Sequence, residues 1–231
     1  MMILPLVSTL VIGILMYFVI GVPIVWATKA LTGFLMGMQG SARFIFGMIM
    51  GGMAAFDFGG PVNKVASLFA DGLLLEGIKE PEAVKILASM VPPFGVTISL
   101  IISRLIKKKK YSKLEEDNIK IAFPMGICMI TEGVIPIAAV DPIRVIASCT
   151  IGAAIGGGIS MYLGIGSPVP SGGMFIVPAM NHPLLFCLAL LIGSVITALL
   201  LVILKREPKE NEINSTEEDE GELDLSSVKI S

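Results

Sequence analysis

Charge is scarce along most of this sequence, and that scarcity excludes a soluble globular domain. Asp, Glu, Lys and Arg make up 16% of the 231 residues, whereas about a quarter of a soluble domain is charged. Hydrophobic residues make up 54% of the chain, and the mean hydropathy is +0.85. The sequence therefore predicts a membrane protein.

The residue types that carry most enzyme chemistry are also few. His182 is the only histidine, and the three cysteines, Cys128, Cys149 and Cys187, match no metal-site spacing. The sequence contains no P-loop, no G-x-S-x-G motif, no metal-binding helix motif and no set of nucleophile and base that an intramembrane enzyme would need. We therefore expect no catalytic residue, no metal and no cofactor, and we interpret the cysteines as small buried hydrophobic side chains.

Long apolar runs are present instead. Four of them reach the length that a helix needs to cross about 30 Å of hydrocarbon, namely residues 3–26, 87–105, 145–165 and 184–204. Pro92 and Pro93 interrupt the second run. Residues 71–85 are polar, and we expect them at the membrane interface. The predicted fold class is all-α: a polytopic membrane protein with transmembrane helices.

Two further segments are apolar but too short or too broken to span a membrane. Residues 44–56 lead into an acid, two glycines and a proline, and residues 166–182 alternate apolar residues with Gly, Ser and Pro. Irregular backbone at membrane depth is tolerated only where it is buried in protein or lines a water-filled cavity. We therefore predict two re-entrant hairpins. An exposed loop is the alternative for the first.

The charges that do occur are segregated along the chain. Seven basic residues lie between residues 104 and 120, and short basic loops stay in the cytoplasm. A nucleic-acid patch is a poor alternative beside a membrane span, so we expect no nucleic-acid partner. Residues 207–231 carry nine acids and two lysines, a net charge of −7, which leaves +5 for the rest of a chain whose total is −2. We predict a membrane domain over residues 1–204 and a disordered cytoplasmic tail over residues 205–231.

The most informative stretch, residues 130–142, sets one acid among helix-breaking residues. Glu132 is followed by Gly133 and Pro136 in an otherwise apolar segment. A carboxylate at membrane depth costs about 2.5–3.5 kcal/mol, so it usually faces a cavity and has a function. A broken helix beside such an acid indicates a transporter binding site. We expect Glu132 to accept hydrogen bonds from a substrate; a structural ion pair with Lys64 or Arg144 is the alternative.

Other polar residues lie on the same broken segments. Asn63 and Lys64 lie on the predicted tip of the first hairpin and can hydrogen-bond to hydroxyl groups of a substrate. Lys64 can equally act as a counter-ion. Asp57 is placed to cap or orient that tip. Asp141 precedes Pro142, which is typical of a helix N-terminus. We expect Asp141 to cap that helix or to pair with Arg144, and direct contact with the substrate is the alternative.

Several of these stretches resemble the fructose-family sugar permease, enzyme IIC of the bacterial phosphotransferase system. The stretch 130–142 resembles its Gly-Ile-Thr-Glu-Gly-Ala-Ile-Pro-Phe signature from the second signature residue onward, and residues 56–64 resemble its Phe-Asp-Met-Gly-Gly-Pro-Val-Asn-Lys motif. Shorter matches lie at residues 5–13, 90–93, 141–144 and 172–173. The resemblance covers nearly all of residues 3–204 and adds Thr131, within the signature, to the substrate-binding candidates.

The resemblance implies a function and partners. It implies a multi-pass permease of the bacterial inner membrane that binds a hexose, fructose above all, and presents it to a IIB domain for phosphorylation, with IIA upstream. It also implies a homodimer of the complete protein. Another sugar, such as mannosyl-glycerate, and a non-transporting remnant are the alternatives.

The sequence also departs from the family pattern. The family has roughly a hundred further residues on the amino side, so we expect the chain to be mostly the transport half and to need a missing amino-terminal half as a partner. The family usually has His before the Gly-Gly of the late hairpin, whereas this chain has Ser171, which the resemblance therefore places in the substrate site.

Overall fold

A computed structural model describes residues 3–15, 33, 37 and 40–206, and within residues 3–7 only the backbone. The described elements are α1 (Ile3–Leu15), α3 (Ser41–Phe56), α4 (Pro61–Leu75), α5 (Glu80–Leu105), α6 (Lys113–Ile127), the 3-10 turn η2 (Glu132–Val134), α7 (Ile135–Val140), α8 (Pro142–Tyr162), the 3-10 segment η3 (Gly173–Ala179) and α9 (Pro183–Leu204). Within these residues the fold is all-α, as predicted.

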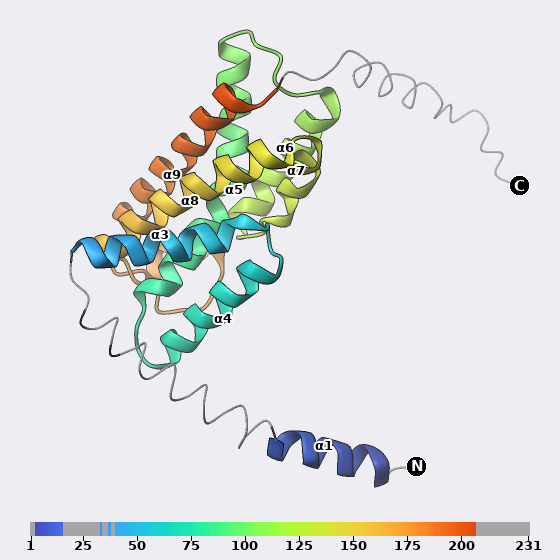
Figure 1. Ribbon diagram of the computed structural model, residues 1–231. Helices are drawn as coiled ribbons and strands as arrows, with labels where there is room; N and C mark the ends of the chain where they lie inside the picture. Colours follow the sequence, from blue (N-terminus) through green and yellow to red (C-terminus); the bar gives the residue numbers. More distant parts are fainter. Residues whose placement is uncertain (1–2, 16–32, 34–36, 38–39, 207–231) are drawn as a thin grey trace, which may run out of the picture.

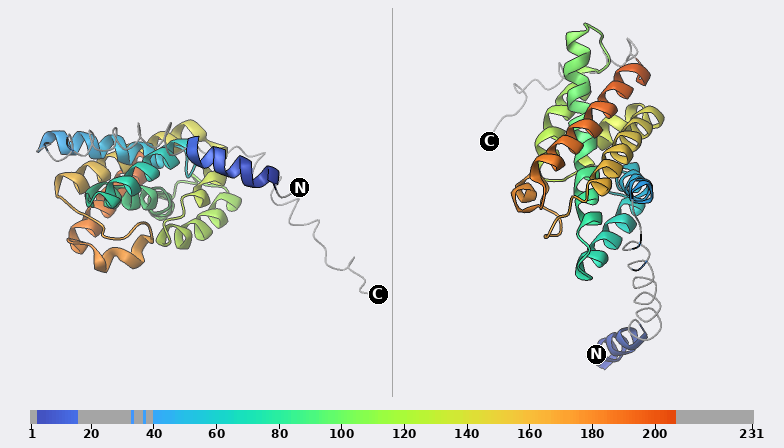
Figure 2. Two further views of the ribbon diagram at one scale, coloured as in Figure 1. Left: turned by 90° about the horizontal axis from the view of Figure 1, so that it is seen from below. Right: turned by 90° about the vertical axis from the view of Figure 1, so that its left-hand side faces the viewer.

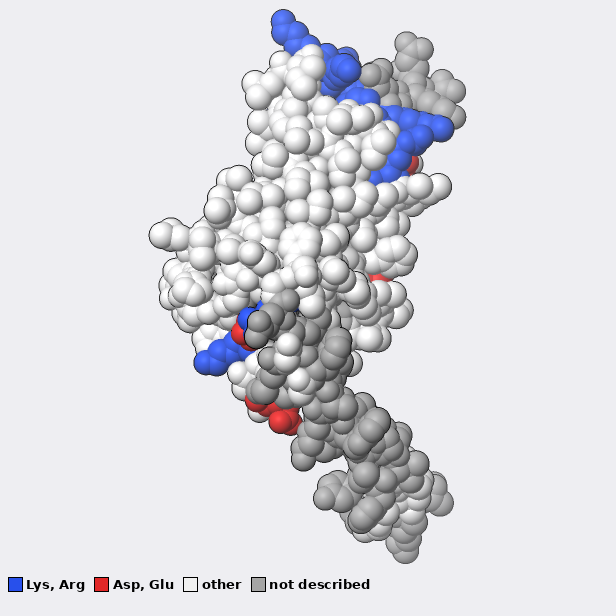
Figure 3. Space-filling view, turned by 60° about the vertical axis from the view of Figure 1, so that its left-hand side comes forward, with Lys and Arg blue, Asp and Glu red and all other residues white. Residues whose placement is uncertain are grey.

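Three helices form the long axis of the packed region. Within the described residues, α5, α8 and α9 are long and apolar enough to cross a membrane. α5, with 26 residues, is about 39 Å long. α9 packs against α5 and α8, and α3 lies along α8 (Figures 1 and 2). On the face shown in Figure 3, Lys and Arg gather at one end, mixed charges lie at the other, and a largely uncharged band with a small acidic patch at its edge separates them. This distribution is that of a membrane-embedded body.

Close helix contacts depend on glycine. A Cβ on Gly157 of α8 would lie 2.6 Å from the Gly47 carbonyl oxygen of α3, and one on Gly51 would lie 2.5 Å from the Ala153 carbonyl oxygen. On the other side of α8, a Cβ on Gly193 of α9 would lie 2.9 Å from the Gly152 carbonyl oxygen. Small residues therefore allow α8 to pack tightly between α3 and α9.

The predicted spans match helices where the structure describes them. Residues 87–105 and 184–204 lie within α5 and α9, whereas α8 covers residues 145–162 of the run 145–165 and ends three residues before it does. Of the run 3–26, residues 3–15 form α1, and the remainder lies outside the described residues, as does residue 207 onward of the predicted tail. The structure contains no bilayer, so the re-entrant position of the two hairpins stays a prediction.

Two expectations about the region before residue 105 are wrong. Residues 71–85 do not lie together at an interface, because Glu82 and Lys85 are 0% and 1% exposed within the bundle. The Pro92–Pro93 pair does not break the helix either, since α5 runs through both prolines. Both prolines are buried there, where α8 and α9 pack against α5, and this packing supports a helix that lacks two backbone donors.

At its basic end, the bundle is closed by a buried ion pair. Lys205, just after α9, lies 2.7 Å from Glu115 Oε1 near the start of α6, and both side chains are at most 2% exposed. Glu115 also completes a capping box with Ser112, which stabilises the start of α6. The Lys205 ammonium lies 4.8 Å from the centre of the Tyr111 ring. Burial raises the pKa of the Tyr111 hydroxyl, which hydrogen-bonds to Ser99 at 2.8 Å.

Candidate functional site

A pocket of about 350 Å³ lies where the broken segments meet. Its walls come from the tip between α3 and α4, from α4, from α5, from the turn between α6 and η2 together with the start of η2, and from the turn before η3. Five predicted site residues line it, namely Asn63, Lys64, Thr131, Glu132 and Ser171. Residues that are more than a hundred positions apart in the sequence are therefore brought to one cavity.

The first wall is the tip between α3 and α4, which Asp57 holds in place. Its carboxylate accepts hydrogen bonds from the backbone N–H groups of Val62 at 2.6 Å and Asn63 at 3.0 Å. These donors belong to the first turn of α4, which begins at Pro61 and would otherwise leave them without helical partners. Asp57 therefore caps and orients the tip, one of the roles that the sequence predicts, and it does not line the pocket.

The tip bends at Gly59, and this bend admits Glu132. Gly59 has φ +98°, and a Cβ there would lie 2.5 Å from Glu132 Oε1. Only glycine suits both the left-handed backbone and this close approach. Within the described part of the chain, no ion pair joins Glu132 to Lys64 or Arg144, and the Glu132 side chain is exposed at the pocket. Its carboxylate oxygens are thus available to a ligand.

Glu132 is presented by a helix end with an unusual residue. Met129 donates to the Gly126 carbonyl and Ile130 donates to the Met125 carbonyl, the hydrogen-bond pair of a Schellman motif. Met129 takes the left-handed position, with φ +67°, that glycine usually fills. Phe58 and Ser171 also have positive φ, at +47° and +59°. Such strain concentrates at functional sites, and all three residues line or adjoin this pocket.

Asn63 and Lys64 differ in their availability. Asn63 is 5% exposed; its Nδ2 donates to the Ala54 carbonyl, and its Oδ1 accepts from Ser67 at 3.3 Å. The Asn63 amide therefore fastens α4 to α3 as well as lining the pocket. Lys64 is exposed at the cavity and pairs with no acid among the described residues, so its ammonium is free to donate.

The sequence reasoning missed a buried charge network behind the pocket. Lys85 of α5 lines the cavity and lies 2.6 Å from Asp71 of α4 and 2.8 Å from Glu82. Glu82 Oε1 also accepts the backbone N–H of Ser171 at 2.9 Å. One buried carboxylate thus ties the late hairpin to α5. The i, i+3 spacing of Glu82 and Lys85 was the available signal.

Two predicted site residues lie elsewhere. Asp141 and Arg144 do not line the pocket; they pair with each other at 3.1 Å. Asp141 occupies the N-cap position of α8 without a side-chain capping bond, and it accepts the Arg206 backbone N–H at 3.4 Å. Pairing, rather than capping, is therefore the outcome for Asp141.

The cysteine interpretation needs a similar correction. Cys149 is buried as expected, but Cys128 and Cys187 are exposed. Cys128 is the C-cap residue of α6, and it lines the pocket. Cys187 lies on α9, many of whose apolar side chains are also exposed.

The chemistry of the lining suits a neutral, hydroxyl-rich ligand. Glu132 offers a charged acceptor, Lys64 a charged donor, and Thr131, Ser67 and Ser89 offer hydroxyls. Pro93 has no N–H, so the Ser89 carbonyl lacks its usual helical partner. In the described region, no group of three or more His, Cys, Asp or Glu residues is placed to hold a metal ion.

Comparison with known proteins identifies the family. The chain is 44% identical over 205 residues to a PTS system fructose-specific EIIC component of Haloferax volcanii, and the match covers 88% of this chain and 54% of that protein. It is 40% identical over 208 residues to a PTS system fructose-specific EIIB′BC component of Xanthomonas campestris pv. campestris, covering 89% and 35%. It is 36% identical over 206 residues to a fructose permease IIC component of Bacillus amyloliquefaciens, covering 89% and 66%.

These matches extend over almost the whole chain. The chain spans about half the length of the first relative and about a third of the second. No protein-family model matches the sequence, and no solved structure matches it. Identities of 36–44% over 88–89% of the chain show that it belongs to the fructose family of enzyme IIC components of the phosphotransferase system.

Proposed function

We propose that the pocket binds a hexose, fructose above all, as the substrate site of a permease. The observation that carries the proposal is the Glu132 carboxylate, which faces a polar cavity on broken backbone without a protein counter-ion in the described chain. Hydrogen bonds to charged groups are worth about 1.5–3 kcal/mol each. The volume of about 350 Å³ lies at the small end of the range for small-molecule pockets, which suits a monosaccharide.

The phosphoryl group comes from a partner in this proposal. None of the lining residues forms an activated nucleophile, and a relative of this chain carries the printed name EIIB′BC. The permease would hold the sugar while a IIB domain, itself phosphorylated through IIA, transfers the phosphate. A carboxylated sugar such as mannosyl-glycerate is the second candidate, because the unpaired Lys64 ammonium would pair with its carboxylate.

Substitution of Glu132 tests the sugar site. We expect Glu132→Ala to weaken fructose binding about 10- to 150-fold, because it removes the charged acceptor. Glu132→Gln should weaken fructose binding less than Glu132→Ala does. Isothermal titration of the full chain in micelles measures the affinity, and thermal unfolding is recorded on the same samples. Asp141→Asn is the matched control: it removes an acid of the same stretch that lies outside the pocket. Parental affinity in Glu132→Ala would refute the site.

We propose further that the chain is a multi-pass protein of the bacterial inner membrane with its basic end in the cytoplasm. Arg104 and the four lysines that follow flank one end of α5, and basic loops stay inside. In a background without native cysteines, an impermeant thiol reagent applied to intact cells should label His182→Cys, before α9, and spare Asp117→Cys, near the basic end. The reverse pattern would invert the topology.

A further inference from the structure

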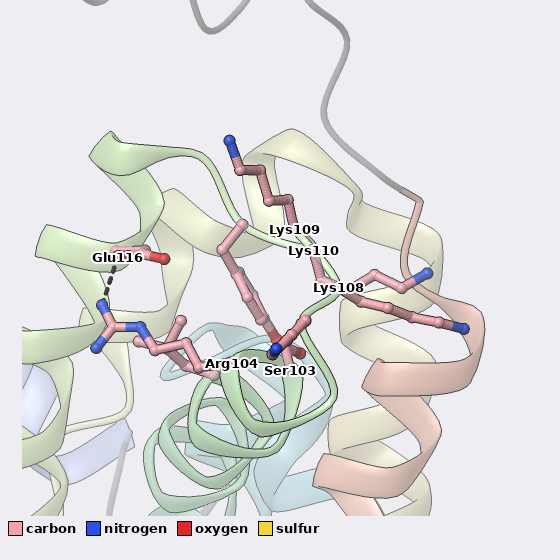
Figure 4. A pocket seen from close by; sticks show the side chains of 9 residues that line it. Ser103, Arg104, Lys108, Lys109, Lys110 and Glu116 are labelled. Atoms are coloured by element: carbon pink, nitrogen blue, oxygen red, sulfur yellow. Dashed lines mark hydrogen bonds and ion pairs between the residues drawn. The ribbon is translucent and has the colours of Figure 1, made fainter.

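A second pocket, separate from the sugar site, lies at the basic end of α5. It has a volume of about 300 Å³ and is lined by the last turns of α5, by residues 107–111 and by Glu116 of α6 (Figure 4). Nothing in the proposed sugar chemistry uses it.

The rim of this pocket is strongly cationic. Arg104 and Lys107 to Lys110 line it together with one acid, Glu116. Two of the five cations are engaged: Arg104 lies 2.5 Å from Glu116, and Lys110 Nζ donates to the Lys205 carbonyl at 2.7 Å. The other three, Lys107, Lys108 and Lys109, are exposed and form no ion pair with a described residue.

The backbone spreads these lysines around the rim. Lys107 has φ +59°, a left-handed conformation that turns the chain sharply at the end of α5. In Figure 4, Lys109 points away from the floor of the pocket, whereas Lys108 and Lys110 extend toward α9. The side chains of Lys108 and Lys109 therefore leave the loop in different directions and do not fill the pocket.

The inner wall is apolar, and further apolar side chains are exposed at the same end of α5. Leu100 and Tyr111 line the pocket and are each 6% exposed. At the same end of α5, Ile101, Leu105 and the C-cap residue Ile106 are 53%, 78% and 53% exposed. A free anion or an acidic protein would have no use for this apolar face, whereas a lipid would cover it with its glycerol backbone and acyl chains.

We propose that this pocket binds an anionic phospholipid. The headgroup phosphate lies among Lys107, Lys108 and Lys109, and the acyl chains follow the exposed apolar side of α5. A phosphate group is the shared chemistry of a lipid headgroup and a free phosphate; the apolar surface selects the lipid. Basic residues just outside a membrane span attract anionic lipids in this way, and the basic end of Figure 3 adjoins the uncharged band.

The test compares two triple variants of the full chain that lose the same charge. One replaces Lys107, Lys108 and Lys109 with Gln. The control replaces Lys79, Lys120 and Arg206 with Gln, three exposed cations outside the pocket. Native mass spectrometry measures binding of short-chain phosphatidylglycerol, of phosphatidylcholine with the same chains, and of inorganic phosphate at equal ionic strength.

We expect phosphatidylglycerol to bind the parent at least about 10-fold more tightly than phosphatidylcholine. The pocket variant should lose about 10- to 100-fold of that affinity, and the control should retain it. Equal losses in both variants would reduce the effect to net charge and refute a pocket. Inorganic phosphate that binds or competes as well as phosphatidylglycerol would refute the lipid. Unchanged thermal unfolding of both variants shows that they fold.

Discussion

Replacement of Lys85 with Met is expected to lower the free energy of unfolding by about 3–5 kcal/mol, the usual cost of removing one partner of a buried ion pair. Lys85 neutralises Glu82 at 2.8 Å, and the Glu82 side chain is 0% exposed. The second Glu82 oxygen, Oε2, has no hydrogen-bond partner among the described groups. Without the ammonium, a carboxylate would stay buried with only the Ser171 N–H to stabilise it.

Two further variants separate this charge effect from lost packing. Asp71→Asn should cost little, since the Asp71 side chain is 40% exposed and Lys85 keeps Glu82 as a partner. Adding Glu82→Gln to Lys85→Met should recover most of the loss, because the amide oxygen still accepts the Ser171 N–H and no buried charge remains. Denaturant titration in micelles measures all four proteins. A double variant no more stable than Lys85→Met would contradict the charge explanation.

The second large effect is expected at the buried ion pair between Glu115 and Lys205, at the basic end of the bundle. Lys205→Met should destabilise the chain by about 3–5 kcal/mol, because it leaves Glu115 buried without a counter-ion. The pair joins the end of α9 to the start of α6, and Lys110 and Lys205 also exchange side-chain to carbonyl hydrogen bonds at 2.7 and 3.2 Å. Loss of Lys205 should therefore free both segments.

Replacing both residues tests whether the charge or the contact matters. Glu115→Leu together with Lys205→Met removes both charges, and such apolar replacements of buried pairs are often neutral or stabilising. Hydrogen exchange of α6 and the end of α9 should rise in Lys205→Met and return toward the parental level in the double variant. Fast exchange in both proteins would contradict the charge explanation and assign the stability to other contacts of the Lys205 side chain, which neither variant retains.

The part of the site that the sequence predicts lies on broken backbone. Glu132 is identifiable because an acid beside Gly133 and Pro136 is costly inside a membrane segment. Asn63 and Lys64 follow from the turn residues that precede α4. That these segments meet in one pocket depends on the close approach of Glu132 to Gly59, which no local pattern encodes.

The network behind the pocket escaped prediction for a physical reason. Lys85 and Asp71 are 14 positions apart and lie on different helices, so only the packing of α4 against α5 brings them together. Locally, residues 71–85 resemble a polar interface, because hydropathy does not distinguish a solvated lysine from one paired in the interior. The pairing of Asp141 with Arg144 was easier to predict, since their i, i+3 spacing at the start of one helix brings the two charges together, and the pair lies outside the pocket.

The most direct test of the sugar site uses a native side chain. Cys128 is exposed and lines the pocket, whereas Cys187 is exposed on α9 outside it. The measurement is the rate at which a small maleimide alkylates each thiol in the full chain, followed by mass spectrometry, with D-fructose or with L-fructose as the matched control. D-fructose at 100 times its Kd should slow Cys128 by up to about 100-fold and leave Cys187 unchanged, and L-fructose should protect neither. Equal alkylation of Cys128 with and without D-fructose would contradict a sugar site in this pocket.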